Sequence, residues 1–504
     1  MSPLAHWRLR ARLLLAAISG ATAALGLAPL GWWPATVIGL VFAAGLACAA
    51  ATRRQAGWTG WVFGASYFAV AMNWIVEPFF VDAVRHGWLA PFALFFMAGG
   101  LALFWAAAFW TAAAVSARSG VRVAVLVFAM SLAELARAYV LTGFPWAAPG
   151  QVWVGTPVAQ VLAWVGPHGL NLLTFGAIMP LGLVLLPAQS RSARLTGIVP
   201  GLVFIALIAL AGPVPDDIPL TGKTVRLVQP NAPQHQKWDP AFIPVFFERQ
   251  VAFTRAGDPP NLIVWPEASV PNRISAVDDP IGTITQAARG ADVVVGMLRP
   301  DSGGYYNSLV HLDGNGTIVG IYDKRHLVPF GEYLPYGGLL RRLGLSAIAS
   351  VVPDGMLSGD GPGIMDFGDI GVALPLICYE AVFAHELDGA GRGTFLLQIT
   401  NDAWFGERSG PYQHLAQARM RAIEQGLPMI RVANTGVSAM IDPYGRIMTS
   451  LPLGEAGYAD AALPEPLTPT IYAKTGDLPV LLMILAFFAG LVMLSLARKV
   501  SIRH

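Results

Sequence analysis

Long apolar segments separated by short polar ones fill the first part of the chain, and one more follows near its end. A helix needs about 17–25 mostly apolar residues to cross the hydrocarbon core of a bilayer. Each of the eight apolar segments is near or above that length, so the pattern predicts eight transmembrane helices. They cover residues 12–28, 33–51, 58–76, 88–115, 121–141, 160–187, 196–212 and 478–497.

The segment between the seventh and eighth predicted helices has a different pattern, with short β-rich runs, three helical stretches and many turns. Mixed strands and helices of this kind predict a layered α/β domain with buried sheets. The turn sequences DGNG (313–316) and DPYG (442–445) predict hairpins. The predicted strands are 225–228, 262–265, 292–297, 308–312, 317–322, 372–377, 395–400, 429–433 and 437–441, and the predicted helices are 241–256, 280–290 and 411–426.

Composition agrees with a membrane protein. Only 13% of the residues are charged, against about 25% in ordinary soluble domains, and the mean hydropathy is +0.54. We therefore predict a membrane domain over residues 1–212, a catalytic domain over 213–477, and a last helix with a tail over 478–504. The first apolar run could be read as a signal peptide, but seven more runs follow it and no clear cleavage site does.

Arginine and lysine residues gather in alternate loops, and such loops mark the cytoplasmic side of a membrane protein. They begin before the first helix and end after the last, so both termini are expected in the cytoplasm. Residues 213–477 then lie outside, which in a bacterial inner membrane is the periplasm. The basic residues are Arg8, Arg10, Arg12, Arg53, Arg54, Arg118, Arg122, Arg191, Arg194, Arg498, Lys499 and Arg503.

Three residues with complementary chemistry each end an apolar strand of the outer domain. Glu267 follows NLIVWP, Lys324 follows TIVGIYD, and Cys378 follows VALPLI. Side chains at strand ends can project into one site at the rim of a sheet. Cys48 lies in the second predicted helix, so the chain's two cysteines cannot pair, and an unpaired thiol in an oxidising compartment is a liability unless its reactivity is used.

These residue types suit acyl transfer. A carboxylate can take the proton of a thiol, which is a weak nucleophile until it ionises. A lysine ammonium can stabilise both the thiolate and the oxyanion of a tetrahedral intermediate. Taken singly, a strand-end glutamate or lysine is more often part of a surface ion pair, and an isolated cysteine is more often a small buried hydrophobe.

The motifs around these residues resemble the nitrilase superfamily, whose Glu–Lys–Cys triads follow strands in this order. They are WPEAS at Glu267, YDKRHLVPFGE at Lys324 and ICYE at Cys378, with TNDAWFG (400–406) after them. A nitrilase-like domain between seven helices and one helix is similar to the apolipoprotein N-acyltransferase family. The segments QPNAPQHQKWDP (229–240), KRHLVPFGEYLP (324–335) and ELARAYVLTGFPW (134–146) carry that resemblance.

The resemblance implies a two-step reaction without a cofactor. Cys378 would accept a fatty acyl chain from a membrane phospholipid as a thioester. The N-terminal α-amine of an S-diacylglyceryl-cysteine on an apolipoprotein would then receive it as an amide. Glu267 would act as base and Lys324 would stabilise the oxyanion. Phospholipid, apolipoprotein and membrane are thus the expected partners, and no nucleic acid or metal is expected.

Five further residues are expected to support the site or bind substrate. By the resemblance, Glu332 orients the lysine and Trp238 stands at the substrate entrance. Tyr379 and Glu380 line the pocket or support the turn after the cysteine. Trp146 either supports the site or anchors the chain at the membrane interface.

The sequence also predicts a buried ion pair and a membrane-dipping arm, and it leaves two competing functions to consider. Glu134 and Arg137, three residues apart in a predicted span, are expected to pair and lock helices together. The apolar stretch 333–353 is expected to form an amphipathic arm that dips into the membrane and gates the site.

The runner-up function is a membrane-anchored amidohydrolase that uses water in place of the amine. A transporter is disfavoured because the spans hold few charges and show no repeated halves.

Overall fold

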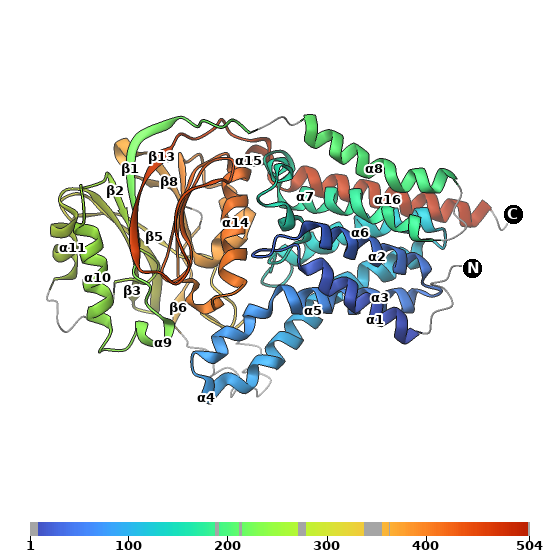
Figure 1. Cartoon of the computed structure of the whole chain (residues 1–504), viewed down its shortest axis with the longest axis horizontal. Helices are drawn as coiled ribbons and strands as arrows, with labels where there is room; N and C mark the ends of the chain where they lie inside the picture. The colour runs from blue at the N-terminus through green and yellow to red at the C-terminus, as the bar shows by residue number, and fades with distance from the viewer. Residues whose placement is uncertain are drawn as a thin grey trace. The chain divides into compact units, whose positions relative to one another are not determined.

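The computed structural model describes residues 9–186, 191–210, 214–270, 279–336, 355–361 and 363–501. The chain divides into two compact units, one formed by residues 1–214 and 474–504 and the other by residues 215–473 (Figure 1). The first unit is helical, and the second contains the sheets. Most of the predicted gating arm (333–353), namely residues 337–353, lies outside the described residues.

A helix forms within each of the eight apolar segments. Among the described residues, four helical segments are long and apolar enough to cross a membrane: Ala83–Val115, Ser119–Tyr139, Pro157–Leu185 and Leu478–Ala497. The predicted count of eight spans is therefore not confirmed. Helix α2 is apolar but only 17 residues long, and α1 and α3 carry arginines that lower their mean hydropathy.

The elements of the helical unit are α1 (Leu9–Ala24), α2 (Trp33–Ala49), α3 (Arg53–Ala71), η2 (Asn73–Phe80), α4 (Ala83–His86), η3 (Gly87–Leu89), α5 (Ala90–Val115), α6 (Ser119–Tyr139), η4 (Pro149–Trp153), η5 (Pro157–Val161), α7 (Leu162–Ile178), η6 (Met179–Leu185), α8 (Arg191–Leu210) and α16 (Leu478–Ser501). The short helix α15 (Ile471–Thr475) lies at the boundary between the units.

Small residues let these helices approach closely, as in other membrane bundles. A Cβ placed on Gly20 of α1 would lie 2.1 Å from the carbonyl oxygen of Phe63 on α3. A Cβ on Gly60 would lie 2.6 Å from the ring of Phe109 on α5. Neither glycine could be replaced without moving a helix apart from its neighbour.

Two of the arginines counted in the loops are buried and bind the end of α2. Arg12 donates to the carbonyls of Leu46 and Ala49, each at 3.1 Å. Arg122 donates to the carbonyl of Ala50 at 2.8 Å. Such contacts satisfy carbonyl groups that the helix itself leaves unpaired and place positive charge at the negative end of its dipole.

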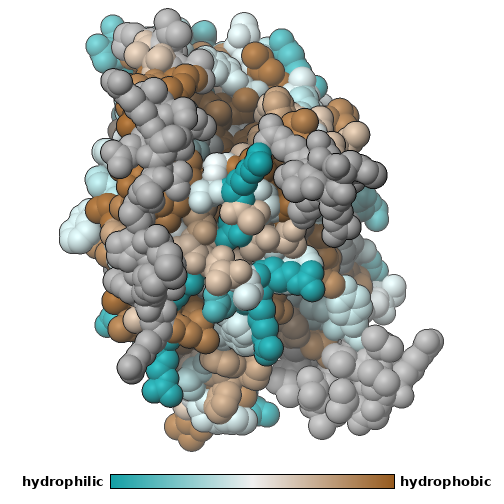
Figure 2. Space-filling model, turned by 90° about the vertical axis from the view of Figure 1, so that its right-hand side faces the viewer, coloured by the Kyte–Doolittle hydropathy of each residue, from teal (hydrophilic) through white to brown (hydrophobic). Residues whose placement is uncertain are grey.

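Other basic residues of the same loops stay exposed, among them Arg53, Arg54 and Arg118. Figure 2 views the chain from the side of the helical unit and shows hydrophilic side chains, in teal, among hydrophobic ones, in brown.

The predicted pair in α6 is confirmed. The side chains of Arg137 and Glu134 are each 1% exposed. Nη2 of Arg137 lies 2.6 Å from Oε2 of Glu134. Trp105 of α5 donates its ring N–H to Glu134 at 2.7 Å, and Arg137 donates to the carbonyl of Trp146 at 2.7 Å. The pair thus joins α5, α6 and the loop after α6, and all the charges have partners, which buried charges require.

The second unit has four layers, helix–sheet–sheet–helix (Figure 1). One sheet has the order β13-β1-β2-β3-β4-β5, with β6 beside β4, and the other has the order β12-β11-β10-β9-β8-β7. One buried cluster, with members such as Leu227 and Ile399, lies between the two sheets. A second packs α10 and α11 on the first sheet, and a third packs α14 on the second.

The strands of this unit are β1 (Leu220–Gln229), β2 (Leu262–Val264), β3 (Asp292–Asp301), β4 (Gly304–Leu312), β5 (Ile318–Asp323), β6 (Met356–Leu357), β7 (Met365–Asp366), β8 (Val372–Ile377), β9 (Phe395–Thr400), β10 (Met429–Ala433), β11 (Ser438–Ile441), β12 (Ile447–Leu451) and β13 (Gly457–Pro464). The helices are α9 (Gln234–Lys237), α10 (Ile243–Arg255), α11 (Pro280–Ala288), η7 (Gly368–Ile370), η8 (Cys378–Val382), η9 (Ala384–Leu387), η10 (Asp402–Phe405) and α14 (Gly410–Gln425).

Both predicted hairpins form. Strands β4 and β5 pair antiparallel around the DGNG turn, where Gly316 donates its N–H to the Asp313 carbonyl at 2.8 Å. Strands β11 and β12 pair antiparallel around DPYG, where Gly445 donates to the Asp442 carbonyl at 2.9 Å. Strands β12 and β13 are absent from the prediction because their exposed faces break the apolar runs on which it depends.

Candidate active site

Glu267 and Lys324 meet at one edge of the first sheet. Strand β2 is parallel to β3, and β5 runs in the same direction because β4 is antiparallel to both β3 and β5. Glu267 follows β2 and Lys324 follows β5, so both residues leave the sheet at the same edge. The Lys324 ammonium lies 3.7 Å from the Glu267 carboxylate.

Two hydrogen bonds fix the carboxylate of Glu267, which is 6% exposed. Asn307 of β4 donates its side-chain N–H to one oxygen at 2.6 Å. The backbone N–H of Asn401, just after β9, donates to the other oxygen at 2.7 Å. The two carboxylate oxygens are therefore held by donors that belong to two different sheets, which fixes the orientation of the carboxylate.

Lys324 is 1% exposed and is held as an ammonium. It donates to Glu332 at 2.8 Å, and the other oxygen of Glu332 accepts the backbone N–H of Val328 at 2.7 Å. Burial lowers the pKa of Lys324, but the carboxylates of Glu332 and Glu267 outweigh it, so the pKa lies above its ordinary value. Glu332 therefore has the lysine-orienting geometry that the sequence predicted.

Cys378 begins η8 directly after β8, with a left-handed backbone (φ 52°). This conformation is uncommon for a residue other than glycine and is typical of strained positions at functional sites. Burial and then the negative charge of Glu267 raise the pKa of the Cys378 thiol, while the Lys324 ammonium lowers it. The net shift is upward, so the resting thiol is protonated and needs a base for attack.

The backbone carbonyl of Cys378 is held from behind by residues that sequence reasoning missed. Gln398 donates its side-chain N–H to this oxygen at 3.2 Å, and Nε2 of His414 lies 3.1 Å from it. His414 in turn faces Asp402 at 2.8 Å, and Arg431 donates to Asp402 at 2.5 Å. A buried network thus fixes the backbone of Cys378. Its members lie far apart in the sequence, on β9, η10, α14 and β10.

Glu380 supports the turn after the cysteine. One of its carboxylate oxygens accepts from the Tyr322 hydroxyl at 3.0 Å and from the backbone N–H of Arg325 at 2.8 Å and of His326 at 3.2 Å. The other accepts from the backbone N–H of Ile377 at 2.6 Å. Glu380 is fully buried, so of the two predicted roles its contacts match support of the turn.

Glu380→Gln should lower the free energy of unfolding by about 1–3 kcal/mol, the cost of leaving one buried donor without an acceptor. An amide has a single oxygen, so its NH₂ group must face one of the N–H or O–H donors. Thermal unfolding of the two proteins in detergent measures the difference, with Glu407→Gln, a loop glutamate next to η10, as the control. Unchanged stability would show that the four contacts do not support the turn.

The three aromatic residues among the predicted supporting residues lie in different environments. Trp238 is 43% exposed and lines a cavity beside Glu267, a position compatible with the predicted entrance role. Trp146 belongs to the helical unit and is fully buried, with its ring 4.5 Å from that of Trp74. Because Trp146 packs inside the helical bundle, its burial disfavours the role of an anchor at the membrane interface. Tyr379 is buried and its ring packs edge-on against Phe383.

Both the helical unit and the α/β unit match known protein families. The family model described as carbon-nitrogen hydrolase matches residues 225–472, and the apolipoprotein N-acyltransferase N-terminal domain matches residues 19–178. The chain is 37% identical to the apolipoprotein N-acyltransferase of Rhodopseudomonas palustris, over 97% of this chain and 95% of the relative. It is 37% identical to that of Caulobacter vibrioides, over 94% and 92%, and 36% identical to that of Bradyrhizobium diazoefficiens, over 98% and 96%.

These matches cover the helical unit and the α/β unit in the same chain, and the relatives align with it nearly from end to end. The chain therefore belongs to the apolipoprotein N-acyltransferase family.

Proposed function

We propose that this protein transfers a fatty acyl chain from a membrane phospholipid to the N-terminal α-amine of S-diacylglyceryl-cysteine on apolipoproteins. The family sets the reaction class. The observation that most favours covalent catalysis is the position of Cys378, a strained and buried thiol whose pKa responds to both Glu267 and Lys324. A site with a nucleophile, a fixed carboxylate and a fixed ammonium has every group that acyl transfer requires.

In the first step, Glu267 takes the thiol proton as the sulfur of Cys378 attacks the ester carbonyl of the phospholipid. Lys324 stabilises the oxyanion that forms. When the tetrahedral intermediate collapses, the C–O bond breaks and the leaving alkoxide recovers the proton from Glu267. The products are a thioester on Cys378 and a lysophospholipid.

In the second step, the free amine of the acceptor attacks the thioester, and Glu267 takes a proton from the amine. The C–S bond breaks, the new amide leaves, and the Cys378 thiolate recovers a proton from Glu267. The high pKa of Lys324 supports its role in both steps, because an ammonium that keeps its proton can donate to an oxyanion but cannot serve as the base.

The proposal is tested with a phospholipid labelled in one acyl chain and a synthetic peptide that begins with S-diacylglyceryl-cysteine. The label should appear on the peptide as an amide. Release of the label only as free fatty acid, at a rate independent of the peptide, would identify a hydrolase instead.

We further propose that all eight long helices cross the bacterial inner membrane, with both termini in the cytoplasm and the α/β unit in the periplasm. The arrangement of arginines supports this orientation. A periplasm-dependent reporter such as alkaline phosphatase should be active when fused near residue 300, and a cytoplasm-dependent one should be active after residue 504. The opposite pair of results would reverse the orientation.

A further inference from the structure

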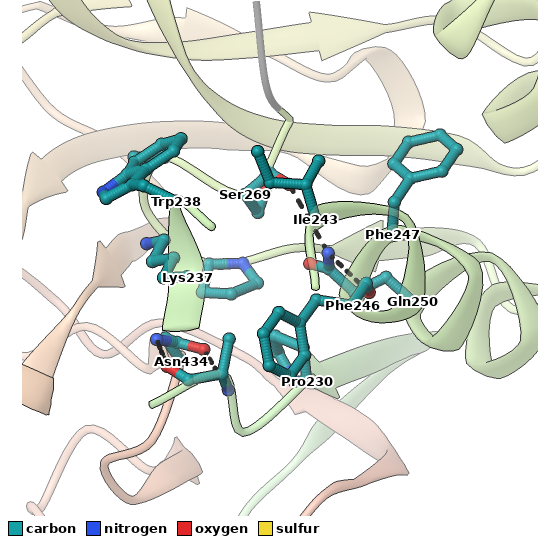
Figure 3. Close-up of a pocket in the computed structure, with 12 residues that line it drawn as sticks. Pro230, Lys237, Trp238, Ile243, Phe246, Phe247, Gln250, Ser269 and Asn434 are labelled. Atoms are coloured by element: carbon teal, nitrogen blue, oxygen red, sulfur yellow. Dashed lines mark hydrogen bonds between the residues drawn. The ribbon is translucent and has the colours of Figure 1, made fainter. Parts of the chain in front are cut away.

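A cavity lies beside Glu267 in the α/β unit, between α9 and α10 (Figure 3). Pro266 and Ala268, the neighbours of Glu267 in sequence, line it. Most of its wall is apolar, including Ile243 and Phe246. Two buried polar side chains, Lys237 and Gln250, enter it from opposite sides (Figure 3).

Lys237 brings a positive charge into this cavity. Its side chain donates to the backbone carbonyl of Glu267 at 3.0 Å and lies 5.4 Å from the centre of the Trp238 ring. In the described part of the chain, the hydrogen bond of the Lys237 ammonium is to this neutral backbone carbonyl and not to a carboxylate. An ammonium has three N–H donors, so the contact with Glu267 leaves donors available for a ligand.

Burial lowers the pKa of Lys237 to about 8, although the negative charge of Glu267, and that of Cys378 once it is ionised, raise it. A buried cation whose charge is only partly compensated is costly. An anionic ligand would remove that cost.

Gln250 supplies an acceptor that nothing in the described residues satisfies. Its side-chain N–H group donates to the carbonyl of Phe246 at 3.1 Å and approaches that of Ser269 at 3.4 Å. Its side-chain oxygen is buried and has no hydrogen-bond partner. Buried acceptors without a hydrogen-bond partner are rare in folded proteins, and each needs an explanation. A bound ligand that donates a hydrogen bond to this oxygen is one such explanation.

We propose that this cavity binds the head group of the donor phospholipid, with Lys237 on its phosphodiester oxygen and Gln250 accepting an N–H or O–H of the head-group alcohol. The inference rests on the proposed function and extends it to a substrate subsite. A peptide group of the acceptor could satisfy the same two side chains, but it is uncharged and would leave the ammonium uncompensated. The apolar wall suits the methylene groups of the head group and glycerol.

The position also suits the first step of the reaction. Lys237 is hydrogen-bonded to the backbone carbonyl of Glu267. A phosphate group held by Lys237 would therefore lie next to the proposed base. Binding energy from this remote part of the lipid can hold its ester carbonyl in place at Cys378, which is how enzymes use non-reacting groups of a substrate.

The test compares two acyl donors in single-turnover acylation of Cys378, a phospholipid in mixed micelles and a phosphate-free p-nitrophenyl ester of the same fatty acid. Lys237→Met should reduce the preference for the phospholipid over the ester by about tenfold or more, as expected for loss of a hydrogen bond to a charged group. Lys237→Arg keeps the charge and should retain most of the preference. The matched control is Lys223→Met, a lysine paired with the exposed carboxylate of Asp369 away from the cavity lining.

Three results would overturn the inference. Equal losses with both donors would give Lys237 a purely structural role at Glu267. A raised half-saturating concentration of the acceptor peptide, with normal phospholipid acylation, would assign the cavity to the peptide. Complete inhibition by inorganic phosphate at the concentration of the phospholipid would assign it to free phosphate. If wild-type protein takes no acyl group from phospholipid but does react with the ester, the proposed function itself is contradicted.

Discussion

Cys378→Ala is expected to abolish acyl transfer and leave a folded protein in the membrane. The side chain is small, and the backbone contacts of residue 378 with Gln398 and His414 do not involve the sulfur. Alanine keeps the hydrogen-bonded carbonyl but provides no nucleophile, so no thioester can form. Transfer of labelled acyl chains to the acceptor peptide measures the loss, and thermal unfolding measures the fold.

Cys378→Ser should be nearly inactive as well. A serine hydroxyl is much harder to deprotonate than a thiol, and the buried site next to Glu267 already raises the pKa of the native thiol. Cys48→Ala is the control, because it removes the chain's other cysteine and should leave transfer intact. Substantial turnover by Cys378→Ala would rule out the covalent mechanism.

Glu267→Gln and Lys324→Met should both block acylation of Cys378, but for different reasons. The glutamine lacks a base, and its NH₂ group would face either the Asn307 or the Asn401 donor that now binds the carboxylate. The methionine keeps the stem of Lys324 and removes the charge that faces the oxyanion. Loss of one oxyanion donor costs on the order of 100- to 1000-fold in rate.

Their pH dependence separates the two roles. With Glu267→Gln, acylation should recover as pH rises, because hydroxide in solution can then ionise the thiol. The recovery should extend above the unperturbed thiol value of about 8.5, since burial raises the pKa of this thiol. Lys324→Met should not recover, because the missing group is not a proton acceptor and the thiolate loses its nearby cation.

The measurement is the rate of acyl-enzyme formation across pH for both variants and for wild type. It tests whether Glu267 is the base and Lys324 the oxyanion stabiliser. Lys223→Met is a suitable control for the lysine, because its ion pair with Asp369 is outside the site. Equal recovery of both variants in alkali would mean that the roles of Glu267 and Lys324 are wrongly assigned.

The sequence predicted those parts of the α/β unit in which local pattern and tertiary environment agree. Strands β8, β9 and β10 have the predicted bounds, because they are buried on both faces and consist mostly of apolar residues. The residues placed after strand ends were also found there. The turn chemistry of DGNG and DPYG fixed two hairpins without any knowledge of the sheet order.

Other parts of the site depend on contacts between segments far apart in sequence. Asn307 and His414 face Glu267 and Cys378 from β4 and α14, and neither stands in a local pattern that marks it. Lys237 could have been noticed, since it precedes Trp238 in one of the segments that carried the family resemblance, but its burial is visible only in the fold. For Trp146 the sequence left two alternatives open, and only the fold shows that the bundle encloses the residue, which disfavours an interfacial anchor.

Cys378 is expected to carry the acyl group between donor and acceptor, and intact-protein mass spectrometry tests this role most directly. After incubation with a phospholipid of defined chains and without acceptor, the protein should gain the mass of one acyl group. Peptide mapping should place it on Cys378, hydroxylamine should remove it, and addition of the diacylglyceryl peptide should move it to the peptide amine. Efficient transfer to the peptide with no adduct on Cys378 at any time would contradict the account.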